Sequence, residues 1–231
     1  MKGQAEREKA NAAREALRLV HQGNVVGLGS GSTAALFIRQ LGAAVSHGLK
    51  IKGVPTSENA AALARRHRIP LVPFEEIDEI DITIDGADEI DPNLNLIKGG
   101  GGALLREKIV AAASSEVVII ASSEKHVSLL GKFPLPVEVV PFARKWVSRQ
   151  ISSLGARVTV RATEGKMPFV TDSGHNILDC RFRSISDPDG LGAGLKTIPG
   201  IVEHGLFIRV ATRVLTGIGD TVVEKYPTPM K

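Results

Sequence analysis

The sequence predicts an α/β fold in which a doubly wound, mainly parallel sheet forms the larger domain and a small α+β unit is inserted into it. Two observations lead to this class. Strand-like and helix-like segments alternate over the first 130 residues, an order typical of a parallel sheet covered by helices on both faces. After Gly131, closely spaced prolines and short strand-like segments replace this alternation and indicate a second packing unit.

The larger domain is expected to begin with a helix over 4–21, because small and apolar residues recur there at helical spacing and Gly23 stands where a C-terminal cap would fall. The apolar run that starts at Val25 predicts the first strand. The alternation then predicts, in chain order, helix 32–45, strand 49–54, helix 58–67, strand 69–74, strand 81–85, a helix beginning near Gly102 and strand 117–121.

The inserted unit is expected to contain two helices and several short strands in the order strand, helix, strand, strand, helix. The segments concerned are helix 143–154, strand-like segments 156–162, 168–172 and 176–182, and helix 187–198. Segments 205–215 and 221–226 are expected to return to the first sheet as short strands. The predicted division is therefore a larger domain over 1–130, completed by 207–231, and an inserted smaller domain over 131–206.

Composition excludes several classes of function. The net charge is +4, but the basic residues are scattered and aromatic residues make up only 4%, so a nucleic-acid groove is not expected. No apolar run is long enough for a membrane helix and no signal peptide is visible, which predicts a cytoplasmic protein with no membrane partner. Cys180 is the single cysteine and the six histidines lack ligand spacing, so neither a disulfide nor a metal site is expected.

A glycine- and serine-rich turn follows the first predicted strand, at Gly27–Thr33. Glycines permit close approach, so backbone N–H groups and the next helix N-terminus can point at a phosphate, with hydroxyls from Ser30, Ser32 and Thr33 as further donors. The third glycine of a dinucleotide fingerprint is missing, although Glu58 after the second strand leaves that alternative open. A turn that only joins strand to helix is the other alternative.

Acidic residues stand where the strand over 81–85 ends. Asp85 and Asp88 are expected at the carboxyl edge of the sheet, where open α/β sheets bind ligands and where carboxylates can handle hydroxyl protons. Their spacing of three does not fit a calcium loop, whose twelfth position would be Leu96. Turn capping is the alternative, and it could explain Asp91 before Pro92 fully.

Lys98 precedes four consecutive glycines, 99–102. Such a run costs chain entropy, which a ligand passing close to the backbone would justify, and Lys98 supplies a positive charge able to stabilise an oxyanion. Lys125 follows the strand over 117–121 and is a second candidate cation for a phosphate or sugar oxygen, although a lysine in a loop is usually only solvated.

Glu107 lies within the helix that follows the glycine run. It shares a face with Ala103, Val110 and Ala111, so partial burial would make it a better proton acceptor. The alternative is a surface glutamate that lies between two basic neighbours. The pattern of this helix alone does not decide between a buried and an exposed Glu107.

Seven motifs taken in order resemble the type A ribose-5-phosphate isomerases, and the resemblance covers nearly the whole chain. The motifs are GSGSTAA, DGADEID, KGGGGALLREK, SSEKHV, LGKFPLPVEVVPFA, PFVTDSGHNILDC and IPGIVEHGLF. The resemblance implies a Rossmann-like main domain with an inserted ferredoxin-like lid, no metal or other cofactor, and a homodimer or dimer of dimers. It also implies interconversion of ribose 5-phosphate and ribulose 5-phosphate, a step of the non-oxidative pentose phosphate pathway.

The resemblance implies roles for individual residues. Glu107 matches the family's proton acceptor, Lys125 its other substrate-binding lysine, and Lys9 is a further phosphate candidate. The phosphate is expected at Ser30, Gly31, Ser32 and Thr33, and the sugar at Asp85, Gly86, Ala87, Asp88, Lys98, Gly99, Gly100 and Gly101. Two residues depart from the family pattern: Ser30 stands where many relatives have Thr, and Gly102 extends the glycine run. Neither departure removes a functional group, so we expect the activity to be adjusted rather than lost.

Isomerisation requires ring opening, removal of the proton beside the carbonyl, and its return one carbon along. We expect Glu107 to move the carbon proton, Asp85 and Asp88 to handle hydroxyl protons, and Lys98 with the glycine amides to stabilise the enediolate. Two other functions stay open from sequence: a sugar-phosphate sensor, although no helix-turn-helix segment is visible, and an amino-sugar phosphate deaminase, which would release ammonia from glucosamine 6-phosphate.

Overall fold

The computed structural model describes residues 2–228, which form two compact units. The first unit contains the chain up to Ala87, then Arg106–Lys125, and the chain from Arg209 onward. The second contains Asp88–Leu105 and His126–Ile208. Residues 88–105, 126–130 and 207–208 thus group with the second unit, although the sequence analysis placed them in the first domain, and the expected division of roles between a catalytic domain and a lid stays a prediction.

A six-stranded sheet organises the first unit, in the order β13-β12-β6-β3-β1-β2. All neighbours are parallel except the edge strand β13, which is antiparallel to β12. The strands are β1 (Val25–Leu28), β2 (Lys52–Pro55), β3 (Ile80–Asp85), β6 (Ser114–Ser122), β12 (Arg213–Ile218) and β13 (Thr221–Lys225). The carboxyl ends of the parallel strands therefore meet at one edge of the sheet, which positions the turns that follow them.

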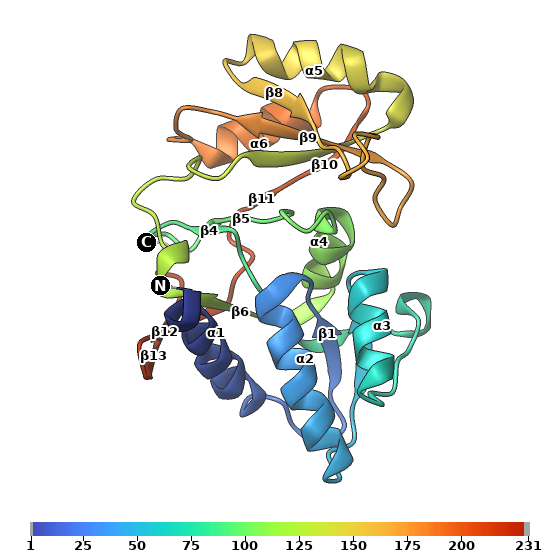
Figure 1. The fold of residues 1–231 in the computed structure, drawn as a ribbon, viewed down its shortest axis with the longest axis vertical. Coiled ribbons are helices and arrows are strands. Elements are labelled where there is room, and N and C mark those ends of the chain that lie inside the picture. The colour runs from blue at the N-terminus through green and yellow to red at the C-terminus, as the bar shows by residue number, and fades with distance from the viewer. Residues whose placement is uncertain (1, 229–231) are drawn as a thin grey trace. The chain divides into compact units, whose positions relative to one another are not determined.

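Helices cover both faces of this sheet, as predicted. The helices α1 (Lys2–Leu17), α2 (Gly31–Ser46) and α3 (Glu58–Arg66) lie on one face (Figure 1). Their apolar residues pack with alternate residues of β1, β3 and β6. On the other face, Val110 of α4 (Leu104–Ala112) packs with Val54 and Ile80. A Cβ on Gly27 would lie 1.8 Å from Thr83 Oγ1 of β3 and 2.9 Å from a Val110 methyl, so a larger residue here would require β3 or α4 to move.

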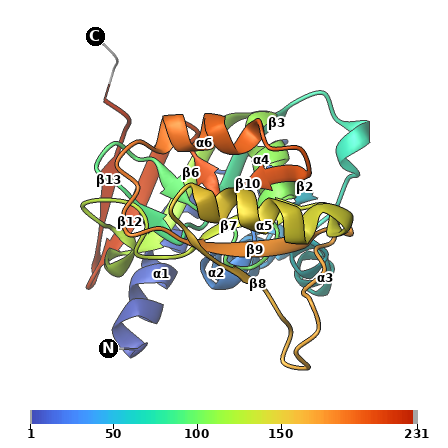
Figure 2. The same cartoon turned by 90° about the horizontal axis from the view of Figure 1, so that it is seen from above.

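The second unit is built on a four-stranded antiparallel sheet in the order β10-β7-β9-β8. Its strands are β7 (Leu135–Val139), β8 (Arg157–Val160), β9 (Asn176–Arg181) and β10 (Ile201–His204). With α5 (Arg144–Ser153) and α6 (Pro188–Lys196) they form the βαββαβ order of a ferredoxin-like fold (Figure 2). Alternate strand residues such as Val137, Leu178 and Cys180 pack in one core with Val147 and Leu195 of the helices.

A small antiparallel sheet, β11-β5-β4, completes the second unit. It is formed by β4 (Glu89–Ile90), β5 (Leu96–Ile97) and β11 (Leu206–Phe207). The short 3-10 helices are η1 (Phe74–Glu76), η2 (Ser123–Lys125) and η3 (Pro141–Ala143).

Three sequence predictions about elements are wrong. Segment 69–74 makes only an isolated bridge between Leu71 and Gly53, because Pro70 and Pro73 lack the N–H groups that a ladder needs. Segment 168–172 likewise makes isolated bridges rather than a strand. Segment 205–215 does not return to the first sheet as a whole, since Leu206–Phe207 pairs with β5 and only the part from Arg213 onward joins β6.

Two features that the described residues lack bear on function. Between residues 2 and 228, no helix is long and apolar enough to span a membrane. Within the same range, no group of three or more His, Cys, Asp or Glu side chains could hold a metal ion. The expected absence of a cofactor stays a prediction.

Candidate active site

The serine-rich turn links β1 to α2 in the first unit. Ser30 caps α2 with an extended backbone, but its side chain makes no capping hydrogen bond to the helix. Its hydroxyl instead bonds to Ser57 Oγ at 2.7 Å and to Thr56 Oγ1 at 2.8 Å. Gly31 follows with φ +88° and is exposed together with Ser32, so an anion can reach the first turn of the helix, whose N–H groups have no partner within the helix.

Thr56 and Ser57 support this turn, and sequence reasoning missed them in that role. Thr56 is fully buried and donates to the carbonyl of Leu28 at 3.0 Å, while Ser57 caps α3 by accepting from Ala60 N. They stand where a dinucleotide-binding protein would place its ribose-binding acid. Glu58, which left that alternative open, forms an ion pair with Arg106 at 2.9 Å.

Asp85 ends β3 and lies against the same turn. Its side chain is buried, and Oδ1 accepts from the N–H of Ser30 at 3.1 Å and from the N–H of Gly86 at 2.7 Å. A Cβ on Gly29 would lie 2.2 Å from Asp85 Oδ1 and 2.6 Å from its Cα, so this approach requires glycine. Asp85 therefore connects the end of β3 to the turn after β1, in agreement with its predicted place at the carboxyl edge of the sheet.

Lys9 reaches the turn from α1. Its Nζ lies 3.3 Å from Ser32 Oγ and pairs with Glu6 at 2.9 Å. The structure thus places this lysine beside one of the hydroxyls predicted to bind phosphate, where its charge would favour an anion.

Glu107 is buried in α4, with 5% of its surface exposed. Ala103, Val110 and Ala111, which share its helix face, are buried as well, whereas the neighbouring Arg106 and Lys108 are partly exposed. The alternative of a surface glutamate is therefore wrong. A carboxylate in this position is shielded from bulk water, which suits a group that must take a proton from carbon.

Lys125 lies in η2, directly after β6, and is partly exposed. The turn is held by Glu8 of α1, which accepts from the Ser123 N–H at 3.0 Å and from the Ser123 hydroxyl at 2.8 Å. Glu8 also accepts from the Gly219 N–H at 3.0 Å, and this bond, together with those from Ser123 and Gln4, lowers the pKa of Glu8 from 4.5 to about 2 despite its burial. Ionised Glu8 thus fixes the turn that contains Lys125 through its hydrogen bonds with Ser123.

The second unit contains the other predicted site residues. Lys98 is buried, with its N–H bonded to the carbonyl of Gly205 at 2.8 Å and its Nζ 5.5 Å from the centre of the Phe207 ring. Asp88 accepts from the N–H of Gly100 at 2.7 Å, so this predicted catalytic acid also holds the glycine run. Gly99 has φ +100°, a conformation that the run could not adopt easily with another residue.

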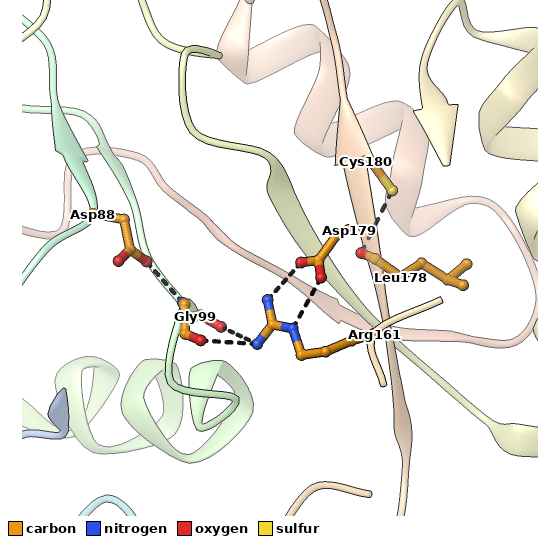
Figure 3. A network of polar contacts seen from close by, with 7 residues as sticks. Asp88, Gly99, Arg161, Leu178, Asp179 and Cys180 are labelled. Atoms are coloured by element: carbon orange, nitrogen blue, oxygen red, sulfur yellow. Dashed lines mark hydrogen bonds and ion pairs between the residues drawn. The ribbon is translucent and has the colours of Figure 1, made fainter. Parts of the chain in front are cut away.

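Arg161 is the most important residue that sequence reasoning missed in this unit. Its guanidinium donates to the carbonyls of Gly99 at 2.8 Å and Gly100 at 3.0 Å and forms a two-point ion pair with Asp179 (Figure 3). No local pattern could have revealed it, because Arg161 and the glycine run are about sixty residues apart in sequence.

Two acids of the DGADEID motif have structural roles. Asp91 Oδ1 accepts from the N–H groups of Asn93 and Asn95, each at 2.8 Å, so turn capping explains it as expected. Glu89 is buried and accepts from the N–H groups of Gly131 and Phe133.

Cys180 is also structural. Its side chain is fully buried, and burial together with the neighbouring Asp179 charge raises the pKa of its thiol, which makes a reactive thiolate unfavourable.

The predicted site residues divide between the two units. The serine-rich turn, Asp85, Gly86, Ala87, Glu107 and Lys125 belong to the first, where Ser30, Asp85 and Gly86 are joined by hydrogen bonds. Asp88, Lys98 and the glycine run belong to the second, where Asp88 and Gly100 are in contact.

Comparison with known protein families shows which family this chain is similar to. The family model described as ribose 5-phosphate isomerase A (phosphoriboisomerase A) matches residues 52–221. The chain belongs to this family. Its resemblance to the type A ribose-5-phosphate isomerases is thereby confirmed over most of its length.

Individual members of the ribose-5-phosphate isomerase A family agree with the assignment. The isomerase A of Sphingopyxis alaskensis is 53% identical, with 93% of this chain and 94% of the relative covered. A solved D-ribose-5-phosphate isomerase in complex with phospho-erythronic acid is 40% identical with a TM-score of 0.94, covering 96% of this chain and 99% of the other. The ribose 5-phosphate isomerase A of Methanocaldococcus jannaschii is 42% identical with a TM-score of 0.91, covering 94% and 97%.

Proposed function

We propose that this chain interconverts D-ribose 5-phosphate and D-ribulose 5-phosphate as a step of the non-oxidative pentose phosphate pathway. The observation that carries the proposal is membership of the ribose 5-phosphate isomerase A family over most of the chain, at 53% identity to one relative. The first unit contains both a buried glutamate and an exposed helix N-terminus, and the pair fits that activity, since one can move a proton and the other can hold a phosphate.

The serine-rich turn is the proposed phosphate site. The N–H groups after Ser30, the Ser32 hydroxyl and the Lys9 ammonium supply donors and positive charge in one place. Ser30 keeps its hydroxyl bonded to Thr56 and Ser57, so we assign it chiefly to fixing the turn, with its N–H held by Asp85. Lys125 is the proposed second cation for the substrate.

The reaction conserves all atoms of the substrate. In open-chain ribose 5-phosphate, Glu107 takes the proton from carbon 2, and the C–H electron pair forms the C1–C2 double bond while the carbonyl pair moves to oxygen 1. Protonated Glu107 then returns a proton to carbon 1, the hydroxyl of carbon 2 gives up its proton to become the ketone, and oxygen 1 takes up a proton to become the hydroxyl of carbon 1. Asp85 and Asp88 are proposed to pass the hydroxyl protons and assist ring opening, while Lys98 and the amides of Gly99, Gly100 and Gly101 stabilise the enediolate oxygens.

We further propose that the protein is cytoplasmic, needs no metal or other cofactor, and assembles as a homodimer or a dimer of dimers. Support comes from the family and from the single, buried cysteine, which does not depend on an oxidising compartment. Sedimentation velocity tests the assembly, and a single species with the mass of one chain would contradict it.

Incubation of the chelator-treated protein with ribose 5-phosphate tests the proposed function. We expect formation of ribulose 5-phosphate at the same rate before and after chelation. The proposal fails if no ketose forms, and the assignment of the acidic residues to proton transfer fails if activity requires an added metal. Ammonia release from glucosamine 6-phosphate under the same conditions would support the deaminase alternative instead.

A further inference from the structure

The glycine run 99–102 is held by a side chain that no family motif led us to expect. Arg161 follows β8, and its own backbone is fixed on both sides: its N–H donates to Ile177 O at 2.9 Å and its carbonyl accepts from Phe169 N at 2.8 Å. The base of the side chain is therefore placed by the sheet before the guanidinium makes any contact.

All three guanidinium nitrogens are used. Nε donates to Asp179 Oδ2 at 3.0 Å and Nη2 to Asp179 Oδ1 at 2.5 Å, a two-point pairing that fixes the plane of the group. Nη1 donates to the carbonyls of both Gly99 and Gly100 (Figure 3). The pair is largely shielded from water, with 14% of the Arg161 side chain and 25% of the Asp179 side chain exposed, so its geometry is better defined than that of a surface ion pair.

Fixing these two carbonyls also fixes the N–H groups of the residues that follow. A trans peptide is planar, and its C=O and N–H point in opposite directions. The N–H groups of Gly100 and Gly101 must therefore point away from Arg161. The Gly100 N–H meets Asp88 at 2.7 Å, whereas the N–H of the exposed Gly101 has no hydrogen-bond partner among residues 2–228 and is open to a ligand.

Such restraint matters most for glycine. A run of four glycines loses more conformational freedom on ordering than any other sequence, so without an external hold its amides would sample many directions. Amides that stabilise a developing oxyanion act well only when they are already oriented.

We propose that Arg161, oriented by Asp179, is a positioning residue that sets the direction of the Gly100 and Gly101 amides in the isomerase reaction. This proposal rests on the proposed function. Arg161 makes no contact with the substrate in this account; it acts through the two carbonyls that it binds, and Asp179 acts through Arg161.

Arg161→Met tests the proposal, with Arg157→Met as the matched control. Arg157 is an exposed arginine of β8, the strand that precedes Arg161, and among the described residues it makes no hydrogen bond to the glycine run. For Arg161→Met we expect kcat for ribose 5-phosphate to fall by about 10–10²-fold, the size of effect of a small misplacement of catalytic groups. KM should stay within about three-fold, because the phosphate site is untouched. A kcat loss no greater than that of Arg157→Met overturns the proposal.

Two further variants keep the test decisive. Asp179→Asn should also lower kcat. The double variant Arg161→Met/Asp179→Asn should have the same kcat as Arg161→Met alone, since Asp179 acts through Arg161. Additive losses of kcat in the double variant contradict this. If Arg161→Met does not fold, Arg161→Lys replaces it, because lysine keeps the charge but lacks the planar fork. Wild-type kcat in Arg161→Lys would then overturn the proposal.

Hydrogen exchange supplies a readout that does not depend on activity. The amides of Gly100 and Gly102 are bonded to Asp88 and to the Gly99 carbonyl, and we expect both to exchange faster in Arg161→Met than in the wild type or Arg157→Met. Unchanged exchange contradicts the positioning role. If the wild-type protein is inactive on ribose 5-phosphate, the proposed function is refuted instead. The exchange rates would still show whether Arg161 restrains the glycine run.

Discussion

Glu107 shows how a single side chain acquires its chemistry from its surroundings. It lies between two basic residues in sequence, yet the helix turns its side chain to the buried face while Arg106 and Lys108 stay partly exposed. A carboxylate that is screened from water can accept a proton from carbon without first giving up a full hydration shell. The helix face, rather than the neighbours in sequence, therefore decides its role.

Glu107→Gln should lower kcat by about 10²–10⁴-fold, the usual contribution of a positioned acid or base. KM should change little, because glutamine keeps the shape of the side chain and the phosphate contacts remain. Steady-state kinetics with ribose 5-phosphate measures both, with Glu76→Gln, an exposed glutamate of η1, as the control. Near-normal turnover in Glu107→Gln would refute its assignment as the base.

Sequence patterns suggested candidate residues for the chemistry but not the residues that hold these candidates in place. Ser30, Asp85, Lys98 and Glu107 stand in short motifs whose residue types fit a reaction, so each could be proposed without a structure. Thr56, Arg161 and Asp179 act through contacts between distant segments, which no local motif records. Asp85 is both a candidate for the chemistry and a residue that holds the turn in place. Its motif predicted the first role but not its hydrogen bond to the Ser30 N–H.

At the scale of elements, the turn between β1 and α2 depends on the close approach of β3. Gly29→Ala would place a methyl group 2.2 Å from Asp85 Oδ1 and 2.6 Å from the Asp85 Cα, so the backbone of one strand end must move. We expect a loss of about 1–3 kcal/mol of stability, typical of overpacking, and a raised KM because the turn shifts.

Thermal and denaturant unfolding measure the stability change. Gly194→Ala is the control, since this helical glycine has open space around it and its replacement should stabilise α6 by about 0.5–1 kcal/mol. Equal stability of Gly29→Ala and the wild type would show that the two strand ends are not packed as described.

The same turn makes a prediction about substrates. Unphosphorylated ribose lacks the group that the helix N-terminus, Ser32 and Lys9 are proposed to bind, so the remote binding energy that holds the reacting carbons is lost. We expect kcat/KM for ribose to be at least about 10²-fold below that for ribose 5-phosphate, from the loss of one or two hydrogen bonds to a charged group. Comparable values would exclude the turn as a phosphate site.

Periodicity predicted most elements, and proline explains one of the failures. Helices and parallel strands with long regular patterns, such as α2 and β6, lie where expected. Segment 69–74 has the apolar residues of a strand but two prolines that cannot donate to a ladder, so it stays a single bridge. Segment 205–215 is one apolar stretch, and nothing in its pattern marks the point where it leaves one sheet and later joins another.

At the scale of the whole molecule, Glu8 links the start of the first unit to its end. Its carboxylate joins α1 to the η2 turn and to the turn between β12 and β13, segments that lie more than one hundred residues away. Because its pKa in the folded state is about 2, below the ordinary value of 4.5, the ionised form stabilises the fold at pH values above 4.5. That contribution is lost as the pH falls from 4.5 through 2.

Glu8→Gln should therefore cost about 2 kcal/mol of stability at neutral pH, since hydrogen bonds to a charged acceptor are replaced by weaker ones. Urea unfolding of both proteins between pH 7 and pH 2 measures the difference, which should be constant down to about pH 5 and shrink toward pH 2. A difference that does not depend on pH would show that the charge of Glu8 contributes nothing.

The sequence indicated two units through the change after Gly131 from alternating strands and helices to closely spaced prolines and short strands. It did not indicate where the boundaries between the units lie. The glycine run and β4 to β5 group with the second unit although they precede that change by some thirty residues. Short strands such as these, two residues each, carry no periodicity from which a partner could be inferred.

Buried Glu107 is proposed to move a proton between two neighbouring carbons, and the exchange of that proton with solvent can be measured. Ribose 5-phosphate is incubated with the protein in D₂O over many turnovers, and deuterium is followed by NMR at carbon 2 of the aldose and carbon 1 of the ketose. We expect deuterium to accumulate at both positions with the wild type and about 10²–10⁴-fold more slowly with Glu107→Gln. Full equilibration of the two sugars with no deuterium in either, or equal rates for both proteins, would contradict the account.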